Sequence, residues 1–327
     1  MISKAQAMTE SRSFREFFGT NRETDLKLEL LAQGEYHANF LFYIRDQPLV
    51  LRINTGSQLH LEKQVSYEYQ ALTEIHPSGR TPKPIYLDDS SQVIEEGVLV
   101  MEYLPGRPLD YRKDLGEAAR VLSDIHALKV EETQLMEVDA PLDGIFQECL
   151  VMAEKYLSWQ KAPLESARLL ERMIEATARL PLKEQTGERH YINTELNSGN
   201  FLISSHSHLV DWEKPIISEI SQDLGHFLAP TTTYWKSDVI LSPEEMRQFI
   251  MSYREAAEER FDTYSIHERL SLFLKATCLR GISWSAMALR EYEAPRTLVN
   301  ADTHQKVREY LSVDFLEMIY KHYMVRP

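Results

Sequence analysis

Short runs of apolar, β-branched and aromatic residues, separated by turn residues, dominate the N-terminal third of the chain. This pattern is typical of strands, and it predicts them at residues 25–32, 37–44, 48–54, 83–88 and 97–104. The first three are joined by short polar connections, which favours an antiparallel meander. Residues 59–76 differ, because apolar or aromatic side chains recur there at helical spacing, at Leu61, Val65, Tyr69 and Leu72. A small sheet with one helix is therefore expected.

Beyond a Pro/Gly hinge at residues 105–110, the apolar positions change to the period of a helix. Helical stretches are predicted at residues 114–128, 143–181, 243–261, 266–292 and 302–324. Ser242-Pro243-Glu244-Glu245 is a capping box with proline at the first helical position. Residues 200–212 are the strand-like island of this half. We therefore expect an α+β, bilobal chain: a β-rich lobe over residues 1–104, and a larger helical lobe over residues 105–327 with an embedded hairpin.

The charge composition restricts the classes of partner that the protein is expected to bind. The 327 residues include 36 Lys and Arg against 50 Asp and Glu, which gives a net charge of −14. Such an acidic surface argues against nucleic acid and against an anionic membrane surface, because both repel it. It is compatible with a small-molecule substrate, including a cationic one. The oligomeric state is not predicted.

The two cysteines and the N-terminal residues indicate the cellular compartment of the protein. Cys149 and Cys278 lie far apart in helix-like segments without metal-binding spacing, so two buried thiols in a reducing environment are expected. No apolar run reaches the roughly 18 residues that a membrane span needs. The first 20 residues lack the apolar core of a secretory signal. These features predict a cytoplasmic protein.

Candidate chemistry concentrates at residues 192–213. Phosphoryl transfer requires a carboxylate that orients the attacking hydroxyl and oxygen ligands that hold magnesium against the phosphates. Glu195 precedes Asn200 by five residues, which is the carboxylate-to-amide spacing of a kinase catalytic loop. Asn200 opens the expected hairpin and Asp211 closes it. Because the two ends of a hairpin converge, Asn200 and Asp211 are the candidate metal pair.

The motifs around this stretch resemble those of the aminoglycoside phosphotransferase and choline kinase-like family, which are relatives of the protein kinases. Asn193-Thr194-Glu195-Leu196-Asn197-Ser198-Gly199-Asn200 resembles the family's catalytic loop, His-Gly-Asp-Leu-His-x-Gly-Asn. Val210-Asp211-Trp212-Glu213 resembles its metal strand, Ile-Asp-Trp-Glu. Further similarities follow in family order: Gly34 near the phosphate-covering loop, Val50-Leu51-Arg52 at the phosphate-binding strand, its partner Glu68, the adenine-contacting hinge Met101-Glu102-Tyr103, and Ser221-Gln222-Asp223-Leu224.

The resemblance implies a protein-kinase-like fold and a small-molecule kinase that uses ATP or GTP with Mg²⁺. It implies that Arg52 binds the phosphates with Glu68 as its partner, and that the nucleotide base lies beside Met101, Glu102 and Tyr103. It further implies that Asn200 and Asp211 hold magnesium while Glu195 orients the acceptor hydroxyl. The resemblance does not identify the acceptor.

Two departures from the family pattern leave an alternative open. Asn193 replaces the loop histidine, and Glu195 replaces the aspartate that acts as base. The extra methylene moves the carboxylate by about 1.5 Å, and a misplacement of about 1 Å can cost on the order of a hundredfold in rate. If the backbone has not adjusted, the chain is a catalytically silent nucleotide-binding protein.

Several other residues can be interpreted either as structural or solvent-exposed or as functional. Glu213 either assists magnesium or faces solvent. His190, His206 and His208 are expected to be exposed turn residues rather than metal ligands, because no cysteine or shared helix face accompanies them. Asp223 is expected to hold the catalytic loop by accepting backbone N–H bonds.

Overall fold

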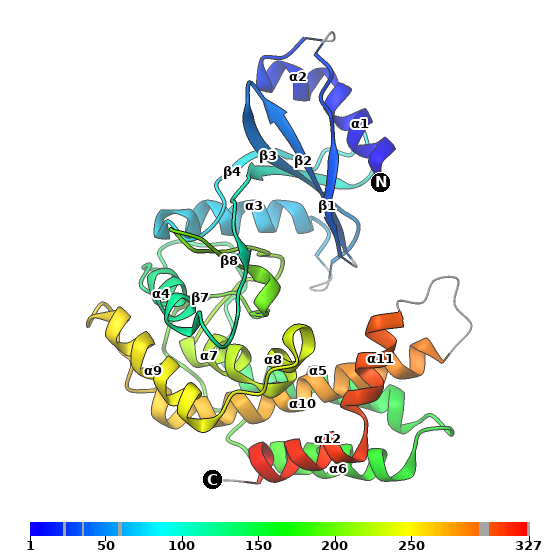
Figure 1. Ribbon diagram of the computed structural model, residues 1–327, viewed down its shortest axis with the longest axis vertical. Coiled ribbons are helices and arrows are strands. Elements are labelled where there is room, and N and C mark those ends of the chain that lie inside the picture. The colour runs from blue at the N-terminus through cyan, green and yellow to red at the C-terminus, as the bar shows by residue number, and fades with distance from the viewer. Residues whose placement is uncertain (22–23, 35, 58–60, 294–300, 326–327) are drawn as a thin grey trace. The chain divides into compact units, whose positions relative to one another are not determined.

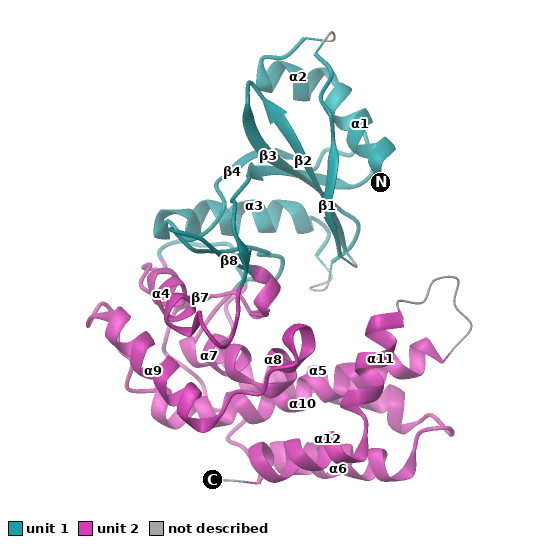
Figure 2. Cartoon of the chain, viewed as in Figure 1, with its two compact units in different colours: residues 1–108, 131–135, 201–215 teal, residues 109–130, 136–200, 216–327 magenta. Residues whose placement is uncertain are grey.

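The computed structural model describes residues 1–21, 24–34, 36–57, 61–293 and 301–325. The chain divides into two compact units, which Figure 2 colours separately. Unit 1 comprises residues 1–108, 131–135 and 201–215, and unit 2 comprises residues 109–130, 136–200 and 216–327. The segment that follows Asn200 therefore belongs to the sheet-containing unit, whereas the candidate catalytic loop belongs to the helical one.

Unit 1 is built on a five-stranded antiparallel sheet. Its strands are, in spatial order, β1 (Glu29–Gln33), β2 (His37–Ile44), β3 (Gln47–Asn54), β5 (Gly97–Glu102) and β4 (Pro84–Asp88). The expected meander is confirmed. In the register of the sheet, Arg52 of β3 is paired with Asn39 of β2 and with Leu99 of β5.

Helices α1 (Ile2–Glu10) and α2 (Arg12–Phe18) pack on one face of this sheet (Figure 1). The sequence pattern did not predict them, because their apolar residues are few. Their buried side chains join those of β3 in one core cluster that includes Met8, Phe14, Leu49, Leu51 and Ile53. The ring of Phe14 lies 5.5 Å from that of Tyr86 on β4, at 73°. Because side chains alternate along a strand, Arg52 points to the opposite face.

That opposite face carries α3 (Gln64–Ile75), followed by a short 3-10 turn, η1 (His76–Ser78). Val65 of α3 packs so closely on β5 that a side chain at Gly97 would clash with it. The helix predicted at residues 59–76 begins later than expected, at Gln64. Residues 59 and 60 lie outside the described residues. Helix α3 brings Glu68 to the face on which Arg52 lies.

Three short strands complete unit 1: β6 (Arg107–Pro108), β8 (Phe201–Ile203) and β9 (His208–Leu209). β8 pairs with both neighbours, and Phe201 lies opposite Leu209. Trp212 is fully buried, and its indole N–H donates to the carbonyl of Leu209 over 3.1 Å. Helix α3 holds the segment after β9, because Gln64 donates to the carbonyl of Glu213 over 2.6 Å.

Among its described residues, unit 2 is helical apart from a two-stranded ladder, β7 (His190–Ile192) and β10 (Ile216–Ser218). Its helices are α4 (Leu115–His126), α5 (Pro141–Leu157), α6 (Leu164–Ala178), α7 (Ile220–Leu228), α8 (Pro230–Ser237), α9 (Pro243–Ala257), α10 (Ile266–Tyr292), α11 (Ala301–Tyr310), α12 (Val313–Ile319), and the short turns η2 (Ser198–Asn200) and η3 (Tyr320–Met324). The predicted helix at 302–324 is interrupted, because the Ser312 side chain caps a new helix by accepting from the N–H of Phe315.

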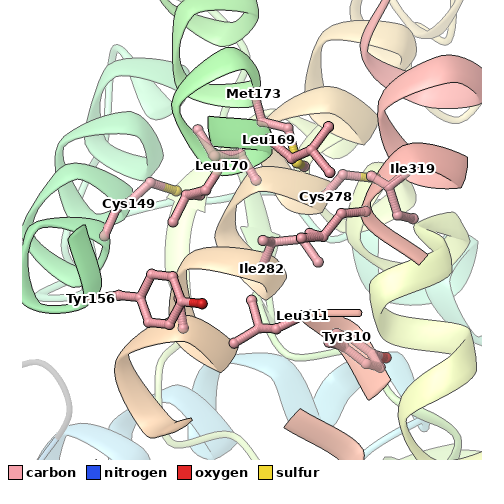
Figure 3. Packing of buried hydrophobic residues seen from close by; sticks show 14 of the residues in the cluster. Cys149, Tyr156, Leu169, Leu170, Met173, Cys278, Ile282, Tyr310, Leu311 and Ile319 are labelled. Carbon is pink, nitrogen blue, oxygen red and sulfur yellow. The ribbon is translucent and has the colours of Figure 1, made fainter. Parts of the chain in front are cut away.

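The core of unit 2 forms where α5, α6, α10 and the C-terminal helices meet (Figure 3). Cys149 and Cys278 lie in it as free, buried thiols, as expected. Tyr156, Met173 and Ile282 fill the space around them without solvent exposure. Within the described part of the chain, no helix combines the length and the apolar character that crossing a membrane requires.

Candidate active site

Arg52 is the centre of a buried charge cluster in unit 1. Its guanidinium lies 2.6 Å from a carboxylate oxygen of Glu68, 3.1 Å from one of Asp211 and 3.8 Å from one of Glu213. Its Nε donates to Oδ1 of Asn39 over 3.0 Å. The expected pairing of Arg52 with Glu68 is thus present, and Asp211 joins it although it lies 159 residues further along the chain.

One cation in this cluster faces three carboxylates. Burial by itself would lower the pKa of Arg52, but attraction to Glu68, Asp211 and Glu213 outweighs it, so the pKa is raised and the guanidinium stays charged. Burial raises the pKa of Glu68, because removal from water penalises the charged form, and Arg52 only partly offsets this. A buried excess of negative charge is costly unless a further cation compensates it.

His37 and Glu213 extend the cluster. The imidazole of His37, at the start of β2, contacts the carboxylate of Glu213. Glu213 is 6% exposed and therefore does not face solvent. Among the described residues, one group of potential metal ligands converges within 4.8 Å, and it consists of His37, Asp211 and Glu213. The sequence had pointed to Asp211, but not to His37.

The candidate catalytic loop of unit 2 runs from β7 to η2 and is fixed by backbone hydrogen bonds. Asp223, near the start of α7, accepts from the N–H of Asn193 and from that of Thr194, each over 2.9 Å. This confirms the expected role of Asp223. The N–H of Leu196 donates to Nδ1 of His226 over 3.1 Å. Thr194 adopts a left-handed conformation with φ of +71°, at the position where the family pattern has glycine.

The two amides of the loop bind the backbone of Glu195. Oδ1 of Asn193 accepts from the N–H of Glu195 over 3.0 Å, so the amide braces the loop where the family has a histidine. Nδ2 of Asn200 donates to the carbonyl of Glu195 over 2.8 Å. Asn200 is buried, whereas Glu195 is half-buried. This orientation of Asn200 assigns its Oδ1 as the atom suited to a metal.

A buried histidine that the sequence did not single out as functional supports Asp223. Nε2 of His126, on α4, lies 3.3 Å from Asp223, and its Nδ1 lies 2.7 Å from the hydroxyl of Tyr253 on α9. His126 and Tyr253 have no solvent exposure beyond 1%. The candidate catalytic loop is therefore anchored through Asp223 to α4 and α9, which are not adjacent to it in the chain.

A second residue that the sequence missed is Arg280 of α10. Its guanidinium binds Glu148 of α5 through two hydrogen bonds, of 2.9 and 3.3 Å. Burial opposes the charge, but Glu148 and, after it, Glu195 raise the pKa of Arg280. The carboxylate of Glu195 is thus close enough to act electrostatically on a cation of α10. No spacing in the sequence links residues so far apart, so only the fold reveals the relation.

The remaining predicted nucleotide contacts all lie in unit 1. Met101, in β5, is buried, and Glu102 and Tyr103 are half-buried. Gly34 is exposed after β1, and its N–H donates to the carbonyl of His37 over 2.9 Å. Glu35 lies outside the described residues.

Of the three histidines expected in exposed turns, His206 is confirmed, whereas His208, which begins β9, and His190 are not. His206 is exposed between β8 and β9, and His208 is half-buried beside it. His190 was wrongly placed: it lies half-buried in β7, and its Nδ1 donates to the carbonyl of His126 over 2.7 Å.

Solved structures of small-molecule kinases share this fold. Choline kinase from Cryptosporidium parvum Iowa II is 13% identical, with a TM-score of 0.66 over 99% of this chain and 97% of that chain. Choline kinase LicA from Streptococcus pneumoniae is 16% identical, with a TM-score of 0.61 over 94% and 98%. Spectinomycin phosphotransferase APH(9)-Ia, in complex with ADP and spectinomycin, is 13% identical, with a TM-score of 0.60 over 90% and 94%.

The chain belongs to the phosphotransferase enzyme family, whose sequence model matches residues 27–264. No curated protein matches it. The resemblance drawn from the motifs is confirmed, and so is the α+β, protein-kinase-like fold. Family and fold together support a phosphotransferase that acts on a small molecule.

Proposed function

We propose that the protein transfers the γ-phosphate of ATP or GTP to a hydroxyl group of a small molecule with the help of a divalent cation, for which Mg²⁺ is the reference ion. The observation that carries this proposal is the cluster in which Arg52 is buried between Glu68 and Asp211. A guanidinium held by a helix carboxylate is suited to phosphate oxygens, and a neighbouring carboxylate is suited to a hard cation.

The chemistry of the donor set fits a divalent cation. Three carboxylates surround Arg52, and one of their oxygens, Oε2 of Glu68, is buried without a hydrogen-bond partner among the described residues. Asp211 and Asn200 would hold the ion, which would neutralise charge on the phosphates. Asn200 is bonded directly to Phe201, whose strand partner Leu209 precedes Asp211 by two residues.

Each residue of the site would then have a separate role in the reaction. Arg52 would bind phosphate oxygens, Gly34 would allow the backbone to approach them, and the segment from Met101 to Tyr103 would contact the base. Glu195 would orient the acceptor hydroxyl. This task needs position more than basicity, and two hydrogen bonds hold the backbone of Glu195: its N–H donates to Asn193, and its carbonyl accepts from Asn200.

Thermal-shift titration with Mg-ATP and Mg-GTP tests the nucleotide half of the proposal. We expect stabilisation, because a ligand that binds only the folded state raises the melting temperature. Asp211→Ala is expected to abolish the shift, and the matched variant Asp262→Ala, in an exposed turn of unit 2, is expected to retain it. No stabilisation of the wild type by either nucleotide would reject the proposal.

Nucleotide consumption in the presence of amino alcohols, sugars and aminoglycosides tests the catalytic half. With an accepted substrate, Glu195→Ala should retain nucleotide binding and lose about a hundredfold or more in kcat. If the loop is adapted to the longer side chain, Glu195→Asp should also lose on the order of a hundredfold, because its carboxylate falls short by about 1.5 Å. A rate that survives Glu195→Ala would show that another group orients the acceptor.

A further inference from the structure

The register of the sheet places His37 on the face of β2 that carries the charge cluster. It lies two residues before Asn39 on β2, so both side chains project to the same face. Asn39 is paired with Arg52 and hydrogen-bonded to it. Ala38, between them, points instead into the core with Met8 and Phe14. The backbone of β2 thus places the imidazole of His37 on the face that carries the charge cluster.

Asp211 and Glu213 reach the same place from the segment after β9. They flank Trp212, whose buried indole anchors this segment to the carbonyl of Leu209. Glu213 is further fixed at its backbone by the hydrogen bond from Gln64. Asp211 and Glu213 precede and follow the buried Trp212, and both direct their carboxylates toward His37. Their potential ligand atoms and that of His37 lie within 4.8 Å of one another.

The candidate ligand atoms at this point are largely buried. Nδ1 of His37 and Oε1 of Glu213 are buried and contact each other, and Oε1 of Glu213 also lies 3.8 Å from the guanidinium of Arg52. The side chains of His37 and Glu213 are 12% and 7% exposed, whereas that of Asp211 is 24% exposed and leaves access from solvent. One imidazole and two carboxylates that converge in this way form a donor set suited to a divalent metal ion.

We propose that His37, Asp211 and Glu213 form a site for a divalent first-row transition metal, with Mn²⁺ as the ion suited to phosphoryl transfer. One imidazole nitrogen with two carboxylates favours such ions over Mg²⁺, which prefers oxygen ligands alone. A divalent ion also balances the excess of carboxylates over Arg52. This inference shares Asp211 with the proposed function and deepens it, because it assigns the protein a metal preference through His37.

The experiment measures binding of Co²⁺ and Mn²⁺ alone to the full-length protein, by visible absorption and by electron paramagnetic resonance. We expect the wild type to bind both ions without nucleotide. His37→Gln should weaken Co²⁺ binding by at least about tenfold, since even the loss of an outer-shell partner of a metal ligand costs 10–100-fold. Glu213→Gln should weaken it similarly, and melting curves establish that each variant is folded.

The matched control is His206→Gln, which alters an exposed histidine of the same unit, beside His208. If that variant loses Co²⁺ and His37→Gln does not, the bound ion is adventitious and the inference is wrong. Should His37→Gln fail to fold, Mn²⁺ bound to the His206→Gln protein must show hyperfine coupling to a directly bound nitrogen. Its absence there would equally overturn the inference.

The result is separable from that of the proposed function. If Mg-ATP stabilises the protein but His37→Gln leaves Co²⁺ and Mn²⁺ binding unchanged, the nucleotide site stands and the transition-metal preference is wrong. If His37 is required for Co²⁺ but no nucleotide stabilises the wild type, the metal site stands and the phosphotransferase proposal fails.

Discussion

Thr194 adopts a backbone conformation that β-branched residues rarely tolerate. Its φ of +71° lies in the left-handed region, where contact between the side chain and the backbone costs roughly 1–2 kcal/mol for residues other than glycine. The conformation persists because Asp223 accepts the N–H groups of both Thr194 and Asn193. Strain that is held by surrounding hydrogen bonds is common at functional sites.

Thr194→Gly is expected to stabilise unit 2 by up to about 1 kcal/mol. The variant relieves the strain, and the relief exceeds the roughly 0.5–1 kcal/mol that glycine costs through greater freedom of the unfolded chain. Thr194→Ala, which shortens the side chain but keeps Cβ, should give no gain. Urea unfolding of the three proteins checks this, and equal stability of the glycine and alanine variants would contradict it.

His190 makes the stability of the protein dependent on pH. Burial, and then the neighbouring His126, lowers the pKa of His190 in the folded state. The unfolded chain therefore takes up a proton near the ordinary value of about 6.5 before the folded chain does. The contribution of His190 is fully present above that pH, and it decreases as the pH falls through it until the lowered folded pKa is reached.

Melting temperatures measured from pH 7.5 to pH 5 check this dependence. We expect His190→Gln to flatten the acid side of the curve, because its amide can still donate to the carbonyl of His126 but does not titrate. The exposed His322 provides the control, and His322→Gln should keep the wild-type slope. A wild-type slope in His190→Gln would show that other groups cause the acid sensitivity.

At the scale of elements, α10 relates the core of unit 2 to its candidate catalytic loop. The helix packs against α5 in the core cluster, and it carries Arg280, which is hydrogen-bonded to Glu148 and whose pKa is raised by Glu148 and Glu195. From this attraction we expect Arg280 to favour one position of the longer Glu195 carboxylate.

Arg280→Met should therefore lower kcat by on the order of tenfold to a hundredfold, as expected for a shift of Glu195 by up to about 1 Å. Stabilisation by Mg-ATP should remain, because Arg52 and Asp211 are unaffected. Arg280→Lys should restore part of the rate, and Arg290→Met, on the same helix but exposed, should leave it unchanged. Parallel loss of kcat and of nucleotide binding would instead indicate a general structural role.

The elements also show what the sequence pattern can predict. The boundaries of β2 and of α10 match their predicted residues, because period-2 and period-3.6 patterns are strong in both. Helices α1 and α2 were missed, since short helices with few apolar residues carry little periodic signal. The interruption of the last predicted helix was missed because Ser312 fits a helical pattern until its capping bond is seen.

At the scale of the whole molecule, the sequence likewise predicts the candidate site only in part. Residues that are close in sequence, such as Glu195 and Asn200, were identified from their spacing. The pairing of Arg52 with Glu68 followed only from family resemblance, and the contact of Arg52 with Asp211 was not predicted. His37, His126 and Arg280 carry no local signal, because each acts on a segment that is distant in sequence and becomes a neighbour only in the folded chain.

The burial of both native cysteines makes the chain suitable for site-selective fluorescent labelling. Burial raises the pKa of Cys149 to about 12 and raises that of Cys278 as well, so neither thiol supplies the thiolate that maleimides attack. Cysteines introduced at exposed positions, for example Gln92 in unit 1 and Lys161 in unit 2, would be the reactive pair. Energy transfer between two dyes would then report directly how the separation of the units responds to nucleotide.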